Sequence, residues 1–225
     1  MLWHVYNAVN SAQRINGTWI LSDSQEVLDA ASSWGAKALM TPEDCPSGTD
    51  RIAWVIDSLD ADVIVNVQAD EPLISSDVVD TLVTALENST ADVATPVYPI
   101  TSLKELMSPN VVKVVRAQDG SALYFSRSPV PHVRDIDLED WLSHAHFWGH
   151  TGVYAYRANV LREFPKLPAG QLETVEKLEQ LRLLEAGSRF LTVEIDYRPH
   201  AVDIPSDLEE VKAILEGFSE KTDGS

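Results

Sequence analysis

The chain has 225 residues, of which 44% are hydrophobic, enough for one substantial core or at most two small ones. It carries 35 acidic and 17 basic residues, so its formal net charge is −18. This charge argues against nonspecific binding to nucleic acid or to an anionic membrane, because both attract basic patches. A polyanionic ligand would need a local cation here to offset the field of the protein.

The single cysteine, Cys45, excludes an internal disulfide and is typical of a reducing compartment. Nothing in the stretch Pro42–Pro46 around it would activate the thiol as a nucleophile. No apolar run is long enough to span a bilayer, and the N-terminus has no basic region followed by an apolar segment. We therefore expect a cytoplasmic protein without membrane insertion.

Strand-like and helix-like segments alternate along most of the sequence. Taken in chain order, the first half predicts strands at 19–21, 36–40 and 63–67 and helices at 26–34, 49–59 and 76–87. The second half predicts strands at 93–98, 111–116, 123–125, 152–156 and 190–195 and helices at 172–185 and 208–218. This alternation indicates an α/β fold with a doubly wound, mainly parallel sheet.

Two segments depart from that alternation. Pro96 lies inside 93–98 and argues against a regular central strand there, because proline cannot donate to a ladder. The stretch 129–148 is irregular and long, which is typical of a lid or an interface.

The most informative stretch is Val63–Pro72, in which an apolar β-branched run breaks into Gln68, Asp70 and Glu71. We interpret it as a buried parallel strand that delivers carboxylates to the edge of the sheet, where open α/β sheets bind ligands. A carboxylate there can hold Mg²⁺, which uses one or two of them plus substrate phosphates. A strand followed by a solvated acidic turn explains the same ten residues equally well.

A second acidic site precedes the last predicted helix. Ser206 is a good N-cap and Asp207 complements the helix dipole, which accounts for both. Asp203 lies ahead of the cap and has no such explanation. It could share a cation with Asp70 if the two strand ends converge.

The stretch Pro46–Arg51 lies between a predicted strand and a helix. Gly48 lets the backbone approach a ligand closely, and the N–H groups at the start of the helix can bind an anion. Arg51 is one of the few basic residues near a predicted strand end. An ordinary loop capped by Ser47 or Thr49 is the common alternative.

The predicted helix 172–185 has an apolar stripe, and Glu173, Glu176 and Gln180 share another of its faces. A solvated face is the default interpretation of such residues. Glu179 and Gln180, in the middle of an apolar helix, could instead point into a pocket.

Three further residues have side chains suited to binding. Arg127 ends an aromatic strand and suits bidentate capture of a carboxylate, although a surface ion pair is the commoner use of arginine. His150 precedes the strand that carries Tyr154. A lone histidine is usually a packed or surface residue, so a role as general base has little support from sequence.

Together these blocks resemble the 3-deoxy-manno-octulosonate cytidylyltransferases, also called CMP-Kdo synthetases, over nearly the whole chain. The resemblance is carried by Met40-Thr41, Ser47–Arg51, Val65–Pro72, Val112–Val115, Ala122–Arg127, His150, Gly152–Arg157, Leu172-Glu173, Leu178–Arg182 and Val202-Asp203. One small departure is Ala69, where the family usually has glycine.

The resemblance implies a nucleotide-diphospho-sugar transferase-like, Rossmann-like three-layer fold. It implies transfer of CMP from CTP to the anomeric hydroxyl of Kdo, with release of pyrophosphate, for lipopolysaccharide synthesis. Asp70 and Asp203 would be the catalytic Mg²⁺ ligands. Kdo would contact Gln68, Arg127, His150, Tyr154, Glu179 and Gln180, and the nucleotide would contact Ser47, Gly48 and Arg51. The region 128–158 would act as a lid and help to form a homodimer.

The front of the chain departs most from the family. Members of the family open with a strand and a basic, glycine-containing loop, whereas Met1–Tyr6 matches the helix that follows this loop. About thirty residues, one strand–loop unit of the doubly wound fold, are therefore expected to be absent. We expect residues 1–225 to be one N-terminally truncated domain, with Met1 an internal methionine of a longer enzyme.

Two other functions are compatible with the sequence. One is a cytidylyltransferase for a related sugar acid, 8-amino-Kdo or sialic acid, although His150 and 178–182 weigh against sialate. The other is a catalytically dead remnant that acts as a dimerising or sugar-binding module.

Overall fold

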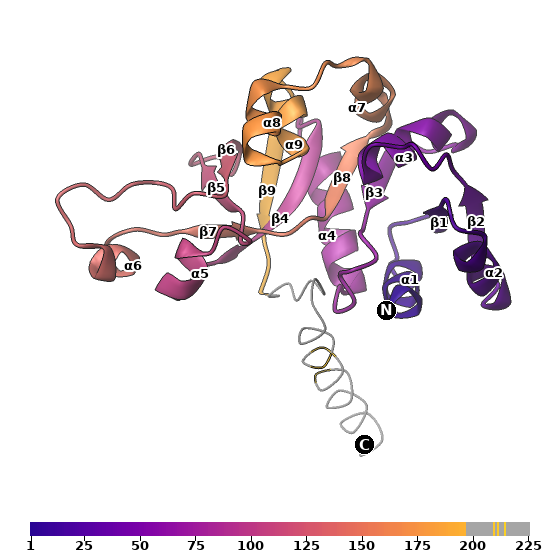
Figure 1. Ribbon diagram of the computed structural model, residues 1–225, viewed down its shortest axis with the longest axis horizontal. Helices are drawn as coiled ribbons and strands as arrows, with labels where there is room; N and C mark the ends of the chain where they lie inside the picture. Colours follow the sequence, from indigo (N-terminus) through magenta and orange to yellow (C-terminus); the bar gives the residue numbers. More distant parts are fainter. Residues whose placement is uncertain (197–208, 210, 212–213, 215–225) are drawn as a thin grey trace.

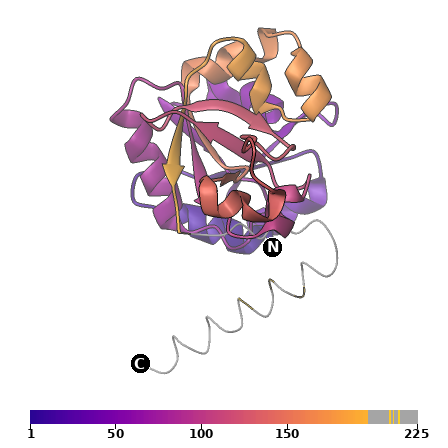
Figure 2. The ribbon, with the colours of Figure 1, turned by 90° about the vertical axis from the view of Figure 1, so that its left-hand side faces the viewer.

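The computed structural model describes residues 1–196 together with Glu209, Val211 and Ile214. Within these residues, helices cover both faces of a central sheet, so that the molecule has three layers (Figures 1 and 2). Asp203 and almost all of the helix predicted at 208–218 lie outside the described residues.

The central sheet has seven strands in the order β3–β8–β4–β7–β5–β6, with β9 beside β4. Their bounds are β3 Val63–Asn66, β4 Val93–Pro99, β5 Lys113–Arg116, β6 Ala122–Ser126, β7 Trp148–His150, β8 Tyr154–Arg157 and β9 Phe190–Glu194. The predicted α/β class is confirmed, but the sheet is mixed rather than mainly parallel. The reason is that β7 and β8 lie between strands of the opposite direction, so that only the β4–β9 ladder of this sheet is parallel.

A second, two-stranded sheet pairs β1 (Trp19–Ser22) with β2 (Lys37–Met40) in parallel, and α2 (Gln25–Ser33) connects them. Among the described residues no ladder joins this pair to β3, whose only partner is β8. The prediction that β3 is a buried parallel strand is therefore wrong. It is an antiparallel edge strand whose three valine and isoleucine residues are half-buried.

Pro96 lies in the middle of β4, which is the most connected strand of the sheet, contrary to the expectation from sequence. On one side β4 pairs with β8 up to Ala94 and with β7 from Val97 onward. Pro96 falls at this change of partner, where a missing N–H breaks no ladder bond, and its carbonyl still accepts from the N–H of Thr151.

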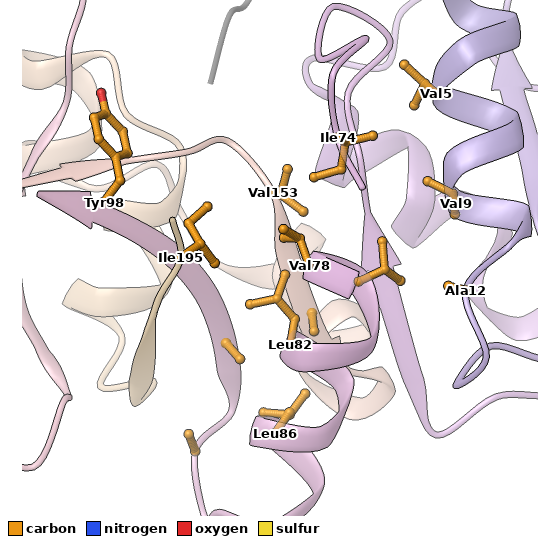
Figure 3. Close-up of a cluster of buried hydrophobic side chains, with 14 of the residues drawn as sticks. Val5, Val9, Ala12, Ile74, Val78, Leu82, Leu86, Tyr98, Val153 and Ile195 are labelled. Carbon is orange, nitrogen blue, oxygen red and sulfur yellow. The ribbon is translucent and has the colours of Figure 1, made fainter. Parts of the chain in front are cut away.

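One face of the sheet is covered by α1 (Leu2–Asn10), α4 (Ser76–Glu87), α5 (Leu103–Met107) and α6 (Trp141–His144). Apolar residues on α4 recur at three- and four-residue spacing and are buried, and Val5 and Val9 of α1 join the same cluster (Figure 3). The opposite face is covered by α3 (Gly48–Val55), α7 (Ala158–Glu163), α8 (Gln171–Glu176) and α9 (Gln180–Glu185). Short 3₁₀ turns occupy Ile56–Ser58, Leu138–Asp140 and Phe164–Lys166.

The single helix predicted at 172–185 is wrong, because α8 and α9 are separated by a break. Lys177 has a φ of 55°, in the left-handed region. The carbonyls of Glu176 and Lys177 accept from the Arg127 guanidinium, at 2.8 and 3.3 Å, instead of from later helical N–H groups. The face that the sequence assigns to solvent is likewise half-buried at Glu173 and buried at Gln180.

The stretch 129–148 is irregular, as predicted, and leads away from the sheet to α6 and back to β7 (Figure 1). It packs on itself through Trp141, which stacks on Phe147 at 6.0 Å and donates from Nε1 to the Ile136 carbonyl. No helix in the described part of the chain has the length and apolarity to cross a membrane.

We expect Leu82→Ala to lower the free energy of unfolding by about 2–5 kcal/mol, because Leu82 is fully buried on α4 and its loss leaves a cavity. Leu123→Ala, at a side chain that is 59% exposed, is the matched control and should change it by less than about 0.5 kcal/mol. Urea unfolding measures both, and equal effects would contradict this assignment of the core.

Candidate active site

A cavity of about 1120 Å³ opens between β1, β3 and the break that separates α8 from α9. Most of the residues predicted for the site line it, namely Ser47, Gly48, Arg51, Gln68, Arg127, His150, Tyr154, Glu179 and Gln180. Asp70 is not among the lining residues, although its neighbours Ala69 and Glu71 are. Residues separated by more than 130 positions therefore share one site.

Ser47 caps α3, as expected if Pro46–Arg51 is an ordinary capped loop. Its Oγ accepts from the N–H of Asp50 at 3.1 Å. The same oxygen lies 2.9 Å from Oε1 of Glu179 and 2.6 Å from Oδ2 of Asp50. The cap thus also ties the start of α3 to the start of α9, across the cavity wall.

Glu179 is largely shielded from water, and this burial raises the pKa of its carboxyl group. Hydrogen bonds from Thr49 and Ser47 oppose the shift, while the nearby Asp50 carboxylate adds to it. Because Glu179 lines the cavity, its carboxyl oxygens can accept hydrogen bonds from hydroxyl groups of a ligand.

Arg51 links the start of α3 to the small sheet. Its Nη2 lies 3.0 Å from Oδ2 of Asp23, which follows β1, and Nη1 donates to Oγ1 of Thr41, which follows β2. The hydrogen bond from Arg51 lowers the pKa of Asp23. Arg51 therefore carries a positive charge held in place by the ends of both strands.

His150 is buried, and its Nε2 lies 2.9 Å from Oγ1 of Thr95. That hydroxyl also lies 2.8 Å from the Val153 carbonyl. A hydroxyl has one hydrogen, so when it donates to the carbonyl its oxygen accepts from Nε2–H, and Nδ1 is then an acceptor. Burial lowers the pKa of His150 to about 3, so the neutral ring can orient a hydroxyl but is a poor base at pH 7.

An aromatic wall continues from His150. Its ring lies 5.3 Å from that of Tyr154, and Tyr154 stacks on Tyr156 at 5.5 Å. Burial raises the pKa of both tyrosines, so both hydroxyls stay protonated. This wall can pack against a sugar ring while the hydroxyl of Tyr154 serves as a polar contact.

Gln180 is 5% exposed, and its Nε2 is buried without a hydrogen-bond partner in the described part of the chain. Such an unpaired donor costs free energy unless a ligand accepts from it. Because Gln180 lines the cavity, its amide is placed to donate to a bound molecule.

Within the described part of the chain, Arg127 does not form the surface ion pair that is commonest for arginine. Its guanidinium donates to backbone carbonyls, at 2.8 Å to Glu176, 2.9 Å to Pro109 and 3.3 Å to Lys177. Three of its five N–H groups are thereby used, and within the described residues two remain for a ligand. The side chain thus shapes the pocket and keeps donors for an anion.

Gly152 lines the cavity beside Gln68, a proximity that sequence reasoning missed. A Cβ at Gly152 would lie 3.3 Å from Nε2 of Gln68. The absence of a side chain there lets Gln68 approach the backbone of the loop before β8. The glycine in the Gly152–Arg157 block was the available signal.

The donor set for Mg²⁺ is only partly described. Asp70 is half-buried in the turn after β3, and Asp203 lies outside the described residues. The part of the chain that the structure describes holds no group of three or more His, Cys, Asp or Glu residues arranged to bind a metal. Mg²⁺ commonly uses only one or two carboxylates beside substrate phosphates, so Asp70 fits as one ligand.

A sequence model of the family described as cytidylyltransferase matches residues 1–194. A solved structure of a CMP:2-keto-3-deoxy-manno-octonic acid synthetase complexed with CTP has a TM-score of 0.89 and 37% identity, and the match covers 96% of this chain and 88% of that one. A 4-diphosphocytidyl-2C-methyl-D-erythritol synthase matches with a TM-score of 0.62 at 13% identity, which shows the fold alone. The fold and the pocket are thus those of nucleotidyltransferases.

Curated relatives identify the family within the nucleotidyltransferases to which the chain belongs. The 3-deoxy-manno-octulosonate cytidylyltransferase of Chloroherpeton thalassium is 44% identical over 213 residues, 93% of this chain and 85% of the relative. That of Geotalea uraniireducens is 42% identical over 217 residues, 94% of this chain and 86% of the relative. The chain belongs to the family of 3-deoxy-manno-octulosonate cytidylyltransferases.

We expect His150 to make folding sensitive to acid. The unfolded state takes up a proton near pH 6.5 and the folded state only near pH 3, so stability falls as the pH drops between these values. His150→Gln should remove up to about 1.4 kcal/mol of this loss for each pH unit. Urea unfolding at pH 7 and pH 4.5 measures it. The exposed His146→Gln is the control, and an identical pH dependence in His150→Gln and wild type would contradict the assignment.

Proposed function

We propose that the protein transfers CMP from CTP to the anomeric hydroxyl of Kdo, giving CMP-Kdo and pyrophosphate, for lipopolysaccharide synthesis. The observation that carries this proposal is the close match to the CTP-complexed synthetase, together with a cavity lined by the residues that the family motifs select. No feature of the described cavity favours a related sugar acid or a dead remnant over this function.

The sugar acid binds at the end of the cavity formed by Arg127, His150, Tyr154 and Gln180. The two remaining N–H groups of Arg127 receive its carboxylate, in keeping with the preference of guanidinium for planar anions. The Gln180 amide donates to a hydroxyl, and Nδ1 of His150 accepts from one. The aromatic wall keeps water from the sugar ring and so strengthens these contacts.

The nucleotide binds at the other end, where Ser47, Gly48 and Arg51 begin α3. A Cβ at Gly48 would lie 4.0 Å from the nearest atom, in Asn66, so the backbone is open to a ligand there. The Arg51 charge and the N–H groups at the start of α3 offset the acidity of the chain locally. Asp70 and Asp203 would hold Mg²⁺, which when bound neutralises phosphate charge and lowers the pKa of the attacking hydroxyl.

A strand and loop between β1 and β3 complete the nucleotide side. The free edges of both strands line the same cavity, and each strand has one ladder partner in the described residues. Unpaired backbone groups at such edges cost free energy when they are buried.

The region 128–158 forms a homodimer interface and a lid. Its irregular part projects from the sheet around Trp141, and Leu138 is 39% exposed there (Figure 1). A projecting segment with an exposed apolar side chain offers a surface on which a second copy of the chain can pack. Sedimentation equilibrium of wild type and of Leu138→Asp tests this, with a monomeric wild type as the contrary result.

The deciding experiment measures pyrophosphate release from CTP and sugar acid with Mg²⁺, using the 225-residue chain and a form lengthened by the codons upstream of Met1. We expect little activity from the shorter chain and rescue in the longer one. Kdo should be used in preference to 8-amino-Kdo and sialic acid. Robust activity of the shorter chain would contradict the proposed completing strand, and preference for another sugar would contradict the proposed substrate.

Gly152→Ala should raise KM for the sugar acid several-fold and leave KM for CTP nearly unchanged, because the added methyl displaces Nε2 of Gln68. Steady-state kinetics of the lengthened enzyme measure both constants. In a Gln68→Ala background the same substitution should have no further effect on KM. Additive effects of the two substitutions would show that Gly152 acts by another route.

A further inference from the structure

Lys113 is the one fully buried lysine among the described residues, with 0% of its surface exposed. It lies at the start of β5, opposite Gly149 of β7 and Ser126 of β6. Burying an ammonium in a core is costly unless each of its hydrogens is bonded. The contacts of its Nζ therefore indicate the structural role of the buried ammonium.

The Lys113 ammonium is fully bonded, and its acceptors are backbone carbonyls. Nζ donates to Ser108 at 2.8 Å, to Val111 at 2.6 Å and to Arg127 at 2.5 Å. The first two carbonyls belong to the loop between α5 and β5, and the third follows β6. One side chain thus ties two separate chain segments together.

Both of these segments form the wall of the cavity at its sugar-acid end. Asn110, Val111, Val112 and Arg127 line it, whereas Lys113 itself does not. The guanidinium of Arg127 holds the same loop through the Pro109 carbonyl, at 2.9 Å. Lys113 and Arg127 thus both donate hydrogen bonds to carbonyls of the same loop.

Among the described residues, Lys113 has no carboxylate partner that would explain its burial as an ion pair. Glu176 acts on it electrostatically, but the Glu176 oxygens accept from Oγ of Ser126 at 2.6 Å and from the N–H of Arg127 at 2.9 Å. Within the described residues, the ammonium therefore forms hydrogen bonds only to the backbone carbonyls of Ser108, Val111 and Arg127.

We propose that Lys113 is a positioning residue of the sugar-acid site, whose ammonium fixes Arg127 and the 108–112 loop so that the free N–H groups of Arg127 meet the carboxylate of the sugar. The proposal rests on the proposed function for its ligand, but its structural part stands on the three carbonyl bonds. Lys113 contacts no substrate and is not a catalytic residue.

This role predicts a dependence on pH. Burial lowers the pKa of Lys113 to about 8, and the Arg127 charge adds to the shift while Glu176 opposes it. The other titratable groups on the packed elements are Tyr124, whose pKa is raised, and the neutral His150. A deprotonated amine keeps two N–H donors for three carbonyls, so the pocket should loosen as the pH rises through about 8.

The test compares wild type, Lys113→Met and the exposed control Lys104→Met by calorimetric binding of Kdo at pH 7 and pH 9. We expect Lys113→Met to raise Kd at least tenfold at pH 7 and to show no further change at pH 9. Wild type and Lys104→Met should bind alike at pH 7 and weaken several-fold at pH 9. Equal affinities in all three proteins, or a wild-type affinity that is flat with pH, would overturn the proposal.

Amide hydrogen exchange separates this proposal from the proposed function. In Lys113→Met we expect faster exchange at 108–112 and at 127–128, with unchanged protection in α4. If wild type does not bind Kdo, the proposed substrate fails, and exchange alone then decides the role of Lys113. Unchanged exchange would overturn it. If Lys113→Met does not fold, the pH dependence of amide protection at 108–112 in wild type replaces it, after correction for the intrinsic rise of exchange rates with pH. Protection that stays constant through pH 8 is then the overturning result.

Discussion

The site depends on the break between α8 and α9, which Arg127 stabilises. Its guanidinium takes the carbonyls of Glu176 and Lys177, and a continuous helix would need both for its own N–H groups. The chain therefore turns at Lys177 and restarts, so that Glu179 and Gln180 face the cavity. Arg127 is thus both a predicted binding residue and the side chain that stabilises the turn before Glu179 and Gln180.

The basic side chains around the site differ in how their charge is balanced, in a chain whose net charge is −18. Arg182 is held by Glu173 at 2.6 Å and packs over Phe164, and Arg51 is held by Asp23. Arg127 and Lys113 instead bond to backbone carbonyls, which neutralise no charge. Among the described residues, Glu176 is the acid that interacts electrostatically with both cations, and an anionic sugar acid would complement their positive field.

The sequence predicts the polar residues of the site far better than the geometry that joins them. The motifs around Ser47, Gln68 and Glu179 identify residues that line one cavity, and it is the family resemblance rather than periodicity that selects all three. The helix break was not predictable from periodicity, since its cause is Arg127, about fifty positions away. The edge position of β3 depends on which other strands pair with it. An apolar run in the sequence does not indicate the strand with which it will pair. Lys113 lies within the Val112–Val115 block that carries the resemblance, but its burial was not predictable, because a lysine within a short strand looks exposed.

His150, Tyr154 and Gln180 at the sugar-acid end are neutral, and for the two titratable side chains burial is the reason. It keeps His150 unprotonated and Tyr154 protonated. Neutral groups can discriminate hydroxyl positions by hydrogen-bond direction, whereas charge alone attracts any anion. Recognition is thereby divided, with Arg127 selecting for an acid and the buried neutral groups selecting among the acids that share its charge. The same division explains why the rigidity of Arg127 matters, because a carboxylate held loosely would present the wrong hydroxyl to each neutral partner.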